Sequence, residues 1–271
     1  MATQQKEMSF LGHLEELRWH LVRSASAIFI FAIIFFIFSE QVYNHFLLAH
    51  LKSDFFTYQL FCDFFNLFGM ESDFCSVNFA EKKLQSIKVT SQLMNSIWSS
   101  FILGIIVSFP YLLWEIWRFV SPGLTPNEIK RSRGFIFIAS LLFFIGVLFS
   151  FYVIAPISIN FLYNYQITDA IENSFTLESH IGLVTNMLLG VSVLFELPVL
   201  IYFLTKIGLI TPEFLKRYRK HALVVVLIVA AIITPPDVAS QVIVAIPVLI
   251  LYEVSITVSR RVIKNQEKNA K

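Results

Sequence analysis

Glu196 is the side chain in this 271-residue chain whose position most strongly suggests chemistry. It lies in the sequence Leu-Phe-Glu-Leu-Pro, in the middle of an apolar stretch, where an ionised carboxylate is costly. Such a group is expected to face protein or water, or to carry a proton. Helical spacing places Thr185 and Ser192 near the same face. Two interpretations follow: Glu196 belongs to a polar patch that binds a partner or substrate, or its carboxyl group finds its hydrogen-bond partners inside the helix bundle.

Three further polar residues interrupt apolar stretches. Gln241 can form a hydrogen bond to a neighbouring helix, or it is an ordinary packing amide. Glu253 is expected to pair with nearby basic groups. Glu115 precedes Arg118 by three residues, so an ion pair within one helix would explain it.

Cys62 and Cys75 are the two cysteines of the chain. Both fall in a long connection that is predicted below to lie outside the cytoplasm, where a disulfide can persist. Either they form a staple on this connection, or they are two unlinked thiols. The six His residues are scattered without metal-ligand spacing, and no glycine-rich phosphate loop is present. The sequence therefore predicts no metal, no cofactor and no nucleotide hydrolysis.

The elements that must position these groups are apolar. A hydrophobic content of 56% with 29 Phe excludes an ordinary soluble domain. Apolar segments in lipid must be helical, because lipid offers no partner for open backbone groups. We therefore predict an all-α, single six-helix membrane domain over residues 1–271. The six spans are expected at 24–39, 93–117, 134–157, 181–204, 222–233 and 238–258. The fifth span is short, because 12 residues make about 18 Å of helix against a hydrocarbon core of about 30 Å.

Basic residues are distributed unevenly between the connections. Seventeen of the 21 Lys and Arg lie in the N-terminal segment, the second and fourth connections and the tail. The third and fifth connections have none. Since positively charged loops stay in the cytoplasm, both termini are predicted to be cytoplasmic. The long first connection, residues 40–92, is predicted to lie outside, with its many Phe and Tyr at the outer membrane surface.

Helix boundaries carry recognisable signals. Ser9 is expected to cap an interfacial helix that leads into the first span. Thr125, Thr211 and Thr234 each precede a proline, as residues that cap a helix start do. Glu128 lies three residues after Thr125 and completes a capping box. Prolines within or at the ends of spans are expected to kink them; these are Pro156, Pro198 and Pro247.

Several motifs occur together, and in order, in one known family. They are His13-Leu14-Glu15-Glu16-Leu17-Arg18, Phe119-Val120-Ser121-Pro122-Gly123-Leu124 with Glu128, Phe195-Glu196-Leu197-Pro198, and Thr234-Pro235-Pro236-Asp237 with Ser240-Gln241. In this the chain resembles TatC, the multi-spanning core of the twin-arginine protein translocase. The first outer connection is longer than the family's usual form, and Trp19 and His20 stand where many relatives have basic residues.

The resemblance implies a function without covalent chemistry. TatC-like proteins recognise twin-arginine signal peptides and recruit single-span partners of the TatA and TatB type in the bacterial inner membrane, so that the proton-motive force drives folded proteins across. The resemblance assigns signal-peptide binding to Glu16, Arg18, Phe119 and Glu128. It assigns Glu196 to a partner-binding groove and Gln241 to a polar position of the sixth span, and we group Thr185 and Ser192 with Glu196.

Other functions remain as alternatives. A secondary transporter would also place a carboxylate at mid-membrane, but it usually has internal repeats, and none is evident. An intramembrane hydrolase needs a nucleophile and a base at helix depth, yet no His or Cys lies in the predicted stretches. We therefore predict that the chain is not an enzyme.

Overall fold

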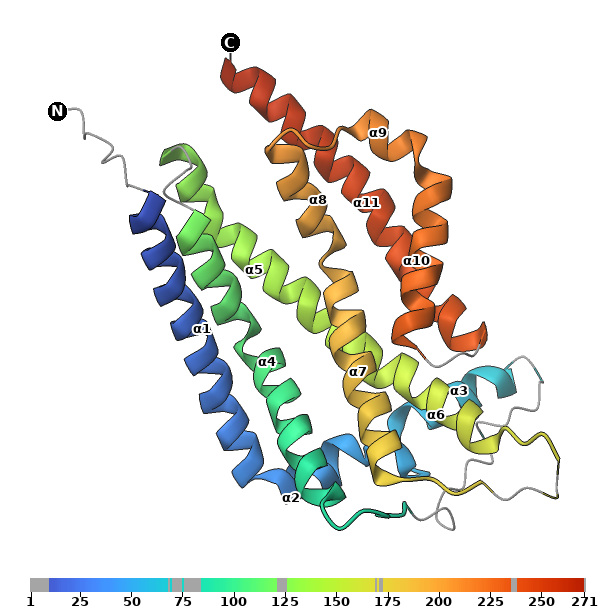
Figure 1. Cartoon of the computed structure of the whole chain (residues 1–271). Coiled ribbons are helices and arrows are strands. Elements are labelled where there is room, and N and C mark those ends of the chain that lie inside the picture. The colour runs from blue at the N-terminus through green and yellow to red at the C-terminus, as the bar shows by residue number, and fades with distance from the viewer. Residues whose placement is uncertain are drawn as a thin grey trace. The chain divides into compact units, whose positions relative to one another are not determined.

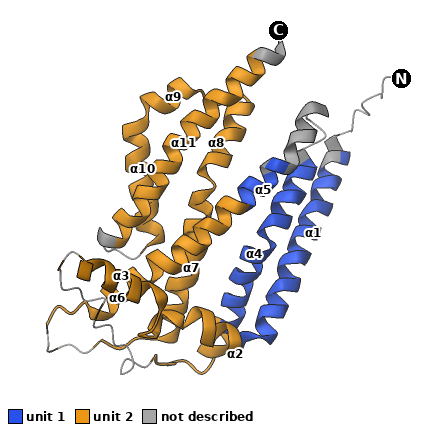
Figure 2. Ribbon diagram, turned by 180° about the vertical axis from the view of Figure 1, so that it is seen from behind, with its two compact units in different colours: residues 1–39, 96–140 blue, residues 40–95, 141–271 orange. Residues whose placement is uncertain are grey.

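A computed structural model describes residues 10–67, 69, 75, 84–120, 126–168, 170, 173–234 and 238–270. The chain divides into two compact units (Figure 2). Unit 1 comprises residues 1–39 and 96–140, and unit 2 comprises residues 40–95 and 141–271. The described residues contain helices and a single isolated backbone bridge but no strand, so the all-α prediction is confirmed.

Unit 1 is built on two long helices that lie side by side (Figure 1), α1 (Phe10–Ile37) and α4 (Ser91–Val120). They come very close at Gly104, where a Cβ atom would lie 2.9 Å from the backbone of both Ile28 and Ala32. Any larger residue would push the helices apart, as is usual where small residues allow membrane helices to touch. Nearby, the ring centroids of Phe29 and Phe101 lie 6.4 Å apart. Helix α1 begins at Phe10, where the predicted helix was expected to start, and it runs without a break from its polar start into its apolar part. Ser9, its predicted cap, lies outside the described residues.

Helix α5 (Pro126–Phe149) belongs to unit 1 as far as residue 140 and to unit 2 from residue 141. It continues through a short π-helical segment, η5 (Ser150–Ile154), into α6 (Ala155–Asn164). Next come α7 (Leu177–Phe195) and α8 (Leu197–Lys206), then α9 (Pro212–Arg217), α10 (Arg219–Ile233) and α11 (Val238–Ala270). Helix α11 packs against α8 and α10. A core of Ile201, Leu215, Tyr252 and Ile256 joins α8, α9 and α11.

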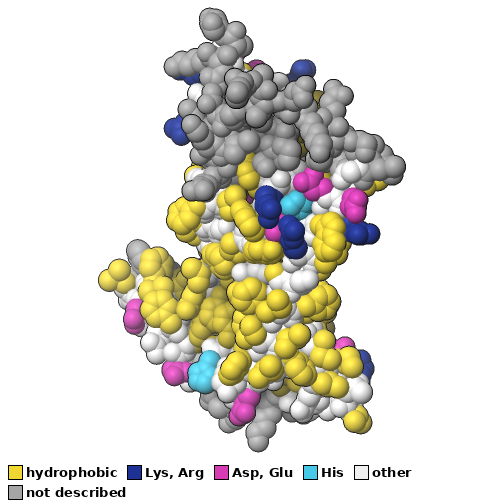
Figure 3. All heavy atoms as spheres, turned by 90° about the vertical axis from the view of Figure 1, so that its left-hand side faces the viewer, with side chains coloured by type: hydrophobic (Ala, Val, Ile, Leu, Met, Phe, Trp, Pro, Cys, Tyr) yellow, Lys and Arg dark blue, Asp and Glu magenta, His cyan; other side chains and the backbone are white. Residues whose placement is uncertain are grey.

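Among the described residues, five helical segments are long and apolar enough to cross a membrane. They are Leu14–Ile37, Ser91–Phe119, Ile136–Asn164, Leu177–Lys206 and Ser240–Glu267. Each predicted stretch except the fifth overlaps one of them, and the helices extend beyond the stretches because helical hydrogen bonding does not stop at the edge of the hydrocarbon. The fifth stretch corresponds to α10, whose 15 residues are fewer than these segments have. On the side of the molecule shown in Figure 3, apolar side chains fill the middle and charged side chains gather toward the ends.

The connections meet in pairs at opposite ends of the helices of unit 2. At one end, the backbone of Gln85 in the first connection bonds to Phe175 and Leu177 at the end of the third, at 2.8 and 2.9 Å. The Lys88 ammonium also lies 3.1 Å from the Glu178 carboxylate. At the other end, the Gln266 amide in the tail donates to the Lys206 carbonyl at 3.0 Å.

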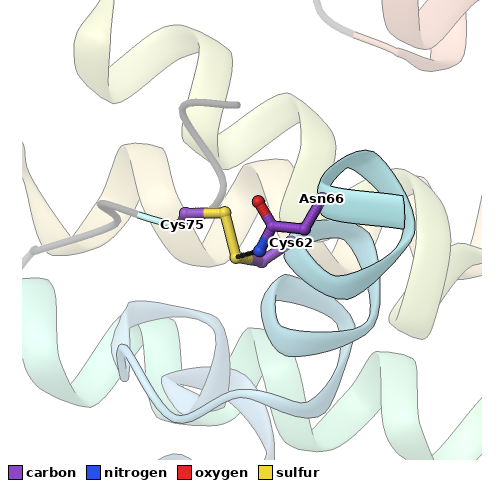
Figure 4. Close-up of a disulfide and its surroundings, with 3 residues drawn as sticks. All are labelled: Cys62, Asn66 and Cys75. Carbon is purple, nitrogen blue, oxygen red and sulfur yellow. Dashed lines mark hydrogen bonds between the residues drawn. A yellow bond between two sulfur atoms is a disulfide. The ribbon is translucent and has the colours of Figure 1, made fainter. Parts of the chain in front are cut away.

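The first connection contains several short helices between residues 39 and 67. It contains α2 (Ser39–Val42), the π-helical η1 (Tyr43–Leu47), the 3-10 helix η2 (Ala49–Leu51) and α3 (Phe56–Leu67). A disulfide joins Cys62 of α3 to Cys75, and the Asn66 amide donates to the Cys62 sulfur at 3.4 Å (Figure 4). The cysteines are therefore a staple in this structure rather than two thiols.

The helix boundaries follow the capping signals in part. Thr211 caps α9 by accepting from the Phe214 N–H at 3.2 Å, with Pro212 at the first turn, as predicted. Thr125 lies outside the described residues. The Thr234 hydroxyl donates to the Ala230 carbonyl at the end of α10. The residues that would form the first turn after Thr234, 235–237, lie outside the described residues, so this cap stays a prediction.

Candidate functional site

The end of unit 1 where α1 begins and α4 finishes holds a buried polar cluster. Glu115 of α4 is 1% exposed and His20 of α1 is 8% exposed. The His20 Nδ1–H donates to Glu115 Oε2, and the Tyr111 hydroxyl donates to Glu115 Oε1 at 2.9 Å. Both carboxylate oxygens are therefore satisfied, and a bond between residues 95 apart joins the two helices. Sequence reasoning considered only an ion pair between Glu115 and Arg118 within α4, and it missed this link.

The residues assigned to signal-peptide binding lie around this cluster. The His20 ring meets Phe119 edge to face at 6.1 Å, so the end of α4 is held against α1. Glu16 lies one turn before His20 and is partly buried, and its Oε2 atom is buried without a hydrogen-bond partner. Arg18 is exposed, with its guanidinium 5.7 Å from the centre of the Trp19 ring.

Glu128 belongs to the first turn of α5, but its side chain lies outside the described residues. The structure thus brings Glu16, His20 and Phe119 to one end of unit 1. A buried carboxylate oxygen without a donor is costly, so this surface is suited to a ligand that brings donors.

Glu196 marks a break between two helices of unit 2. Helix α7 ends at Phe195 and α8 starts at Leu197, with Pro198 in its first turn. The kink expected from this proline is therefore observed. Both carboxylate oxygens of Glu196 are buried without a hydrogen-bond partner. The interpretation of a carboxyl satisfied inside the protein is thus not supported by the contacts of this side chain.

Thr185 and Ser192, by contrast, are fully buried and satisfied. The Thr185 hydroxyl donates to the Ile181 carbonyl at 2.7 Å, and the Ser192 hydroxyl donates to the Leu188 carbonyl. Ser192 also lies at a close helix crossing, since a Cβ atom on Gly146 of α5 would be 2.8 Å from its Cα. These two hydroxyls face packed helix, and their donors are used within α7.

Gln241 and Glu253 make contacts between helices. The Gln241 amide of α11 donates to the Leu227 carbonyl of α10 at 3.0 Å, which is the inter-helix hydrogen bond expected for it. Glu253 pairs with Arg219 of α10 at 2.7 Å, and the predicted pairing with a basic group is confirmed.

Two buried histidines were missed by sequence reasoning. His50 Nε2–H donates to the Phe151 carbonyl at 2.8 Å, and burial lowers the pKa of His50 to about 4. His180 accepts from the Tyr163 hydroxyl at 3.0 Å and donates to the Leu47 carbonyl at 3.2 Å. Tyr58 donates to the His50 carbonyl at 2.9 Å, and burial raises the pKa of this phenol. This network ties the first connection to α7 and η5.

The statement that no His lies in a span therefore needs correction. His20 and His180 both lie in segments long enough to span a membrane, because these helices start earlier than the predicted stretches. Each is hydrogen-bonded to a structural partner, a carboxylate for His20 and a tyrosine and a carbonyl for His180. Among the described residues, no group of three or more His, Cys, Asp or Glu side chains could hold a metal ion.

Comparison with known proteins decides the family. The family model described as Sec-independent protein translocase protein (TatC) matches residues 12–247. The chain belongs to the TatC family. It is 38% identical over 266 residues to TatC of Blattabacterium sp. subsp. Periplaneta americana, covering 98% of this chain and 100% of the relative. It is 36% identical over 258 residues to TatC of Carboxydothermus hydrogenoformans, covering 95% of both chains.

A solved structure shares the fold of this TatC-family chain. The crystal structure of the twin-arginine translocase receptor TatC matches with a TM-score of 0.71 and 30% identity, over 92% of this chain and 99% of that one. The chain is thus a component of a Sec-independent protein translocase and a multi-pass protein of the bacterial inner membrane. The alternative of a secondary transporter finds no support in these relatives.

Proposed function

We propose that this TatC-family chain is the receptor that binds twin-arginine signal peptides. The proposed site lies at the end of unit 1 where α1 starts and α4 ends. The observation that carries the proposal is the buried, unpartnered Oε2 atom of Glu16 beside the rigid His20–Glu115 link. A guanidinium group presents several N–H donors in a planar fork that matches a carboxylate, so an arginine side chain suits this acceptor.

The other assigned residues complete this proposed site. Phe119, held against His20, offers an aromatic surface to the peptide. Glu128 supplies a second carboxylate for the second arginine, and Arg18 belongs to the same element of α1. The chain performs no covalent chemistry in this proposal, and transport of folded cargo draws on the proton-motive force.

We further propose that both termini are cytoplasmic and that α10 is the short fifth span, which brings the number of spans to six. The charge distribution supports this topology. So does the pairing of connections, because the first and third contact each other and the tail contacts the residue that ends α8. Each pair was assigned to one side of the membrane by charge.

Glu196 is the group that we propose for docking a single-span partner of the TatA or TatB type. Its orphaned carboxyl group can accept or donate a hydrogen bond to a polar side chain of a partner helix. Thr185 and Ser192, grouped with it by helical spacing, are buried, and their donors and that of Gln241 are engaged within unit 2, so Glu196 is the group of this set left to meet a partner.

The signal-peptide proposal is tested with matched carboxylates on one helix. Glu16→Gln should weaken binding of a twin-arginine peptide to the purified protein, whereas Glu15→Gln, at an exposed neighbouring position, should not. A peptide with two lysines should lose the difference between the variants, because lysine cannot form the two-pronged contact. Equal binding by both variants would refute a role for Glu16.

Glu128 needs a separate test because it also completes a capping box. Glu128→Gln keeps the capping hydrogen bonds and removes the charge. Reduced peptide crosslinking with unchanged thermal unfolding would support recognition. Normal crosslinking would leave the capping role as sufficient.

A further inference from the structure

Helix α3 of the first connection has three distinct faces. One face packs against the rest of unit 2: Thr57 is 3% exposed and donates to the Tyr152 carbonyl at 2.6 Å, and Tyr58 is 1% exposed. A second face carries exposed polar side chains, Gln59, Asp63 and Asn66. These two faces account for an ordinary surface helix.

The third face of α3 is apolar and exposed. It consists of four side chains at helical spacings of four, four and three, with exposures from 52% to 81%: Phe56, Leu60, Phe64 and Leu67. Side chains at these spacings form one stripe along a helix. The stripe is an apolar surface at the end of a bundle of spanning helices, on a helix that is held firmly on its opposite side.

This stripe continues onto a membrane-spanning surface. The Phe56 ring meets Tyr152 edge to face at 6.4 Å, and Tyr152 is 41% exposed within the span Ile136–Asn164. Tyr152 ends a second exposed stripe on that span, formed with Leu141, Ile145 and Leu148. The second stripe is an exposed apolar row on a helix long enough to span a membrane, which is the character of a surface that meets lipid. Aromatic residues such as Tyr152 and Phe56 concentrate where such a surface leaves the hydrocarbon.

We propose that α3 is an interfacial membrane anchor whose apolar stripe inserts into the leaflet at the end of the spans where residues 40–92 lie. Amphipathic helices bind in this way with the apolar face at the boundary between headgroups and acyl chains. Within α3 the sequence has Asp63 as its one charged residue and has no Lys or Arg. Insertion therefore depends on apolar burial and not on anionic lipid. The disulfide from Cys62 to Cys75 holds the second half of α3 to the following chain (Figure 4).

The test uses a fluorescent probe at matched positions of the full-length protein. Both native cysteines are in the disulfide, so an introduced cysteine is the single free thiol. Leu60→Cys and Gln59→Cys place an environment-sensitive label on the apolar stripe and on the polar face of the same helix. The proteins are reconstituted in phosphatidylcholine vesicles that contain lipids brominated in the upper acyl chain.

The label at position 60 should be quenched several-fold more strongly than the label at position 59. Its emission should also be shifted to shorter wavelength relative to that of position 59. Leu67→Cys should behave like Leu60→Cys. Addition of phosphatidylglycerol or of salt should leave the difference unchanged, and a requirement for either would overturn the proposed apolar mechanism. Equal quenching at positions 59 and 60 would overturn insertion. A blue shift at position 60 without quenching, lost when the protein is diluted with more lipid of the same brominated composition, would show that a second copy covers the stripe, which also overturns the proposal.

Discussion

Glu115 in unit 1 and Glu196 in unit 2 are two carboxyl groups at membrane depth with opposite surroundings. Both oxygens of Glu115 receive hydrogen bonds, from His20 and Tyr111, whereas both oxygens of Glu196 are buried without a partner. A buried charge with partners stabilises a fixed contact between helices, while a buried polar group without partners costs free energy. The difference separates a structural acid from one that is available to another molecule.

His50 lies between these extremes. Its Nε2–H is bonded to the Phe151 carbonyl, and its Nδ1 atom is buried without a partner. These three buried titratable groups therefore form a series: all polar side-chain atoms of Glu115 are hydrogen-bonded, one of two is in His50, and none is in Glu196. Substitution of each should give a different balance between stability and function.

Glu115→Ala should have the largest effect on stability. It leaves His20 and Tyr111 without their acceptor, and breaking a buried pair typically costs about 3–5 kcal/mol. Thermal unfolding of the detergent-solubilised protein measures the loss, and signal-peptide binding should fall with it because α1 and α4 lose their link. Glu115→Gln, which keeps an acceptor, should lose less. A Glu115→Ala protein with wild-type stability would show that the pair is not structural.

Protonation of His50 should lower the stability of the protein in acid. Its folded pKa of about 4 lies below the ordinary value of 6.5, so the unfolded state binds the proton first as the pH falls. The free energy of unfolding should therefore decline between pH 6.5 and 4, by about 3 kcal/mol at pH 4 from this group alone. His50→Gln should flatten the curve in this window. An unchanged curve would mean that another group, such as the neighbouring His180, carries the acid sensitivity.

Glu196→Ala should show the reverse pattern from Glu115→Ala. Stability should stay the same or rise, because an unsatisfied buried carboxyl is removed. Partner docking should weaken by about threefold to thirtyfold, which corresponds to a membrane hydrogen bond of about 0.6–2 kcal/mol. Co-purification of the single-span partner measures docking, and signal-peptide crosslinking should survive. Glu178→Ala, which removes an exposed acid from the first turn of α7, is the control. Full recovery of the partner with Glu196→Ala would place this residue among the structural groups.

Glu253→Gln should have the smallest effect. Its ion pair with Arg219 is about half exposed on both sides, and such pairs contribute about 0.2–1 kcal/mol. The small change in unfolding temperature should vanish at high salt. A loss comparable to that of Glu115→Ala would show that exposure does not set the order of these carboxylates.

Local pattern was sufficient for much of the fold. Long apolar stretches predicted the spanning helices, since a helix in lipid must satisfy its own backbone. Thr211 before Pro212 identified the start of α9, and Pro198 the break beside Glu196. The ends of the apolar stretches were less accurate as helix ends, because α1 already begins at Phe10, well before the stretch predicted from residue 24.

The sequence by itself determined the helical class, and it located the basic connections and the candidate residues for which a function is proposed. Each of these depends on side-chain type and short-range spacing, which the sequence states directly. The tertiary structure alone decided which acid is satisfied. Glu115 is hydrogen-bonded to His20, 95 residues away in the sequence, whereas the Glu196 oxygens have no hydrogen-bond partner, although both acids lie in apolar segments. It also decided that α3 turns four apolar side chains outward, because the face it buries is selected by hydrogen bonds to η5 and η2 and not by its own periodicity.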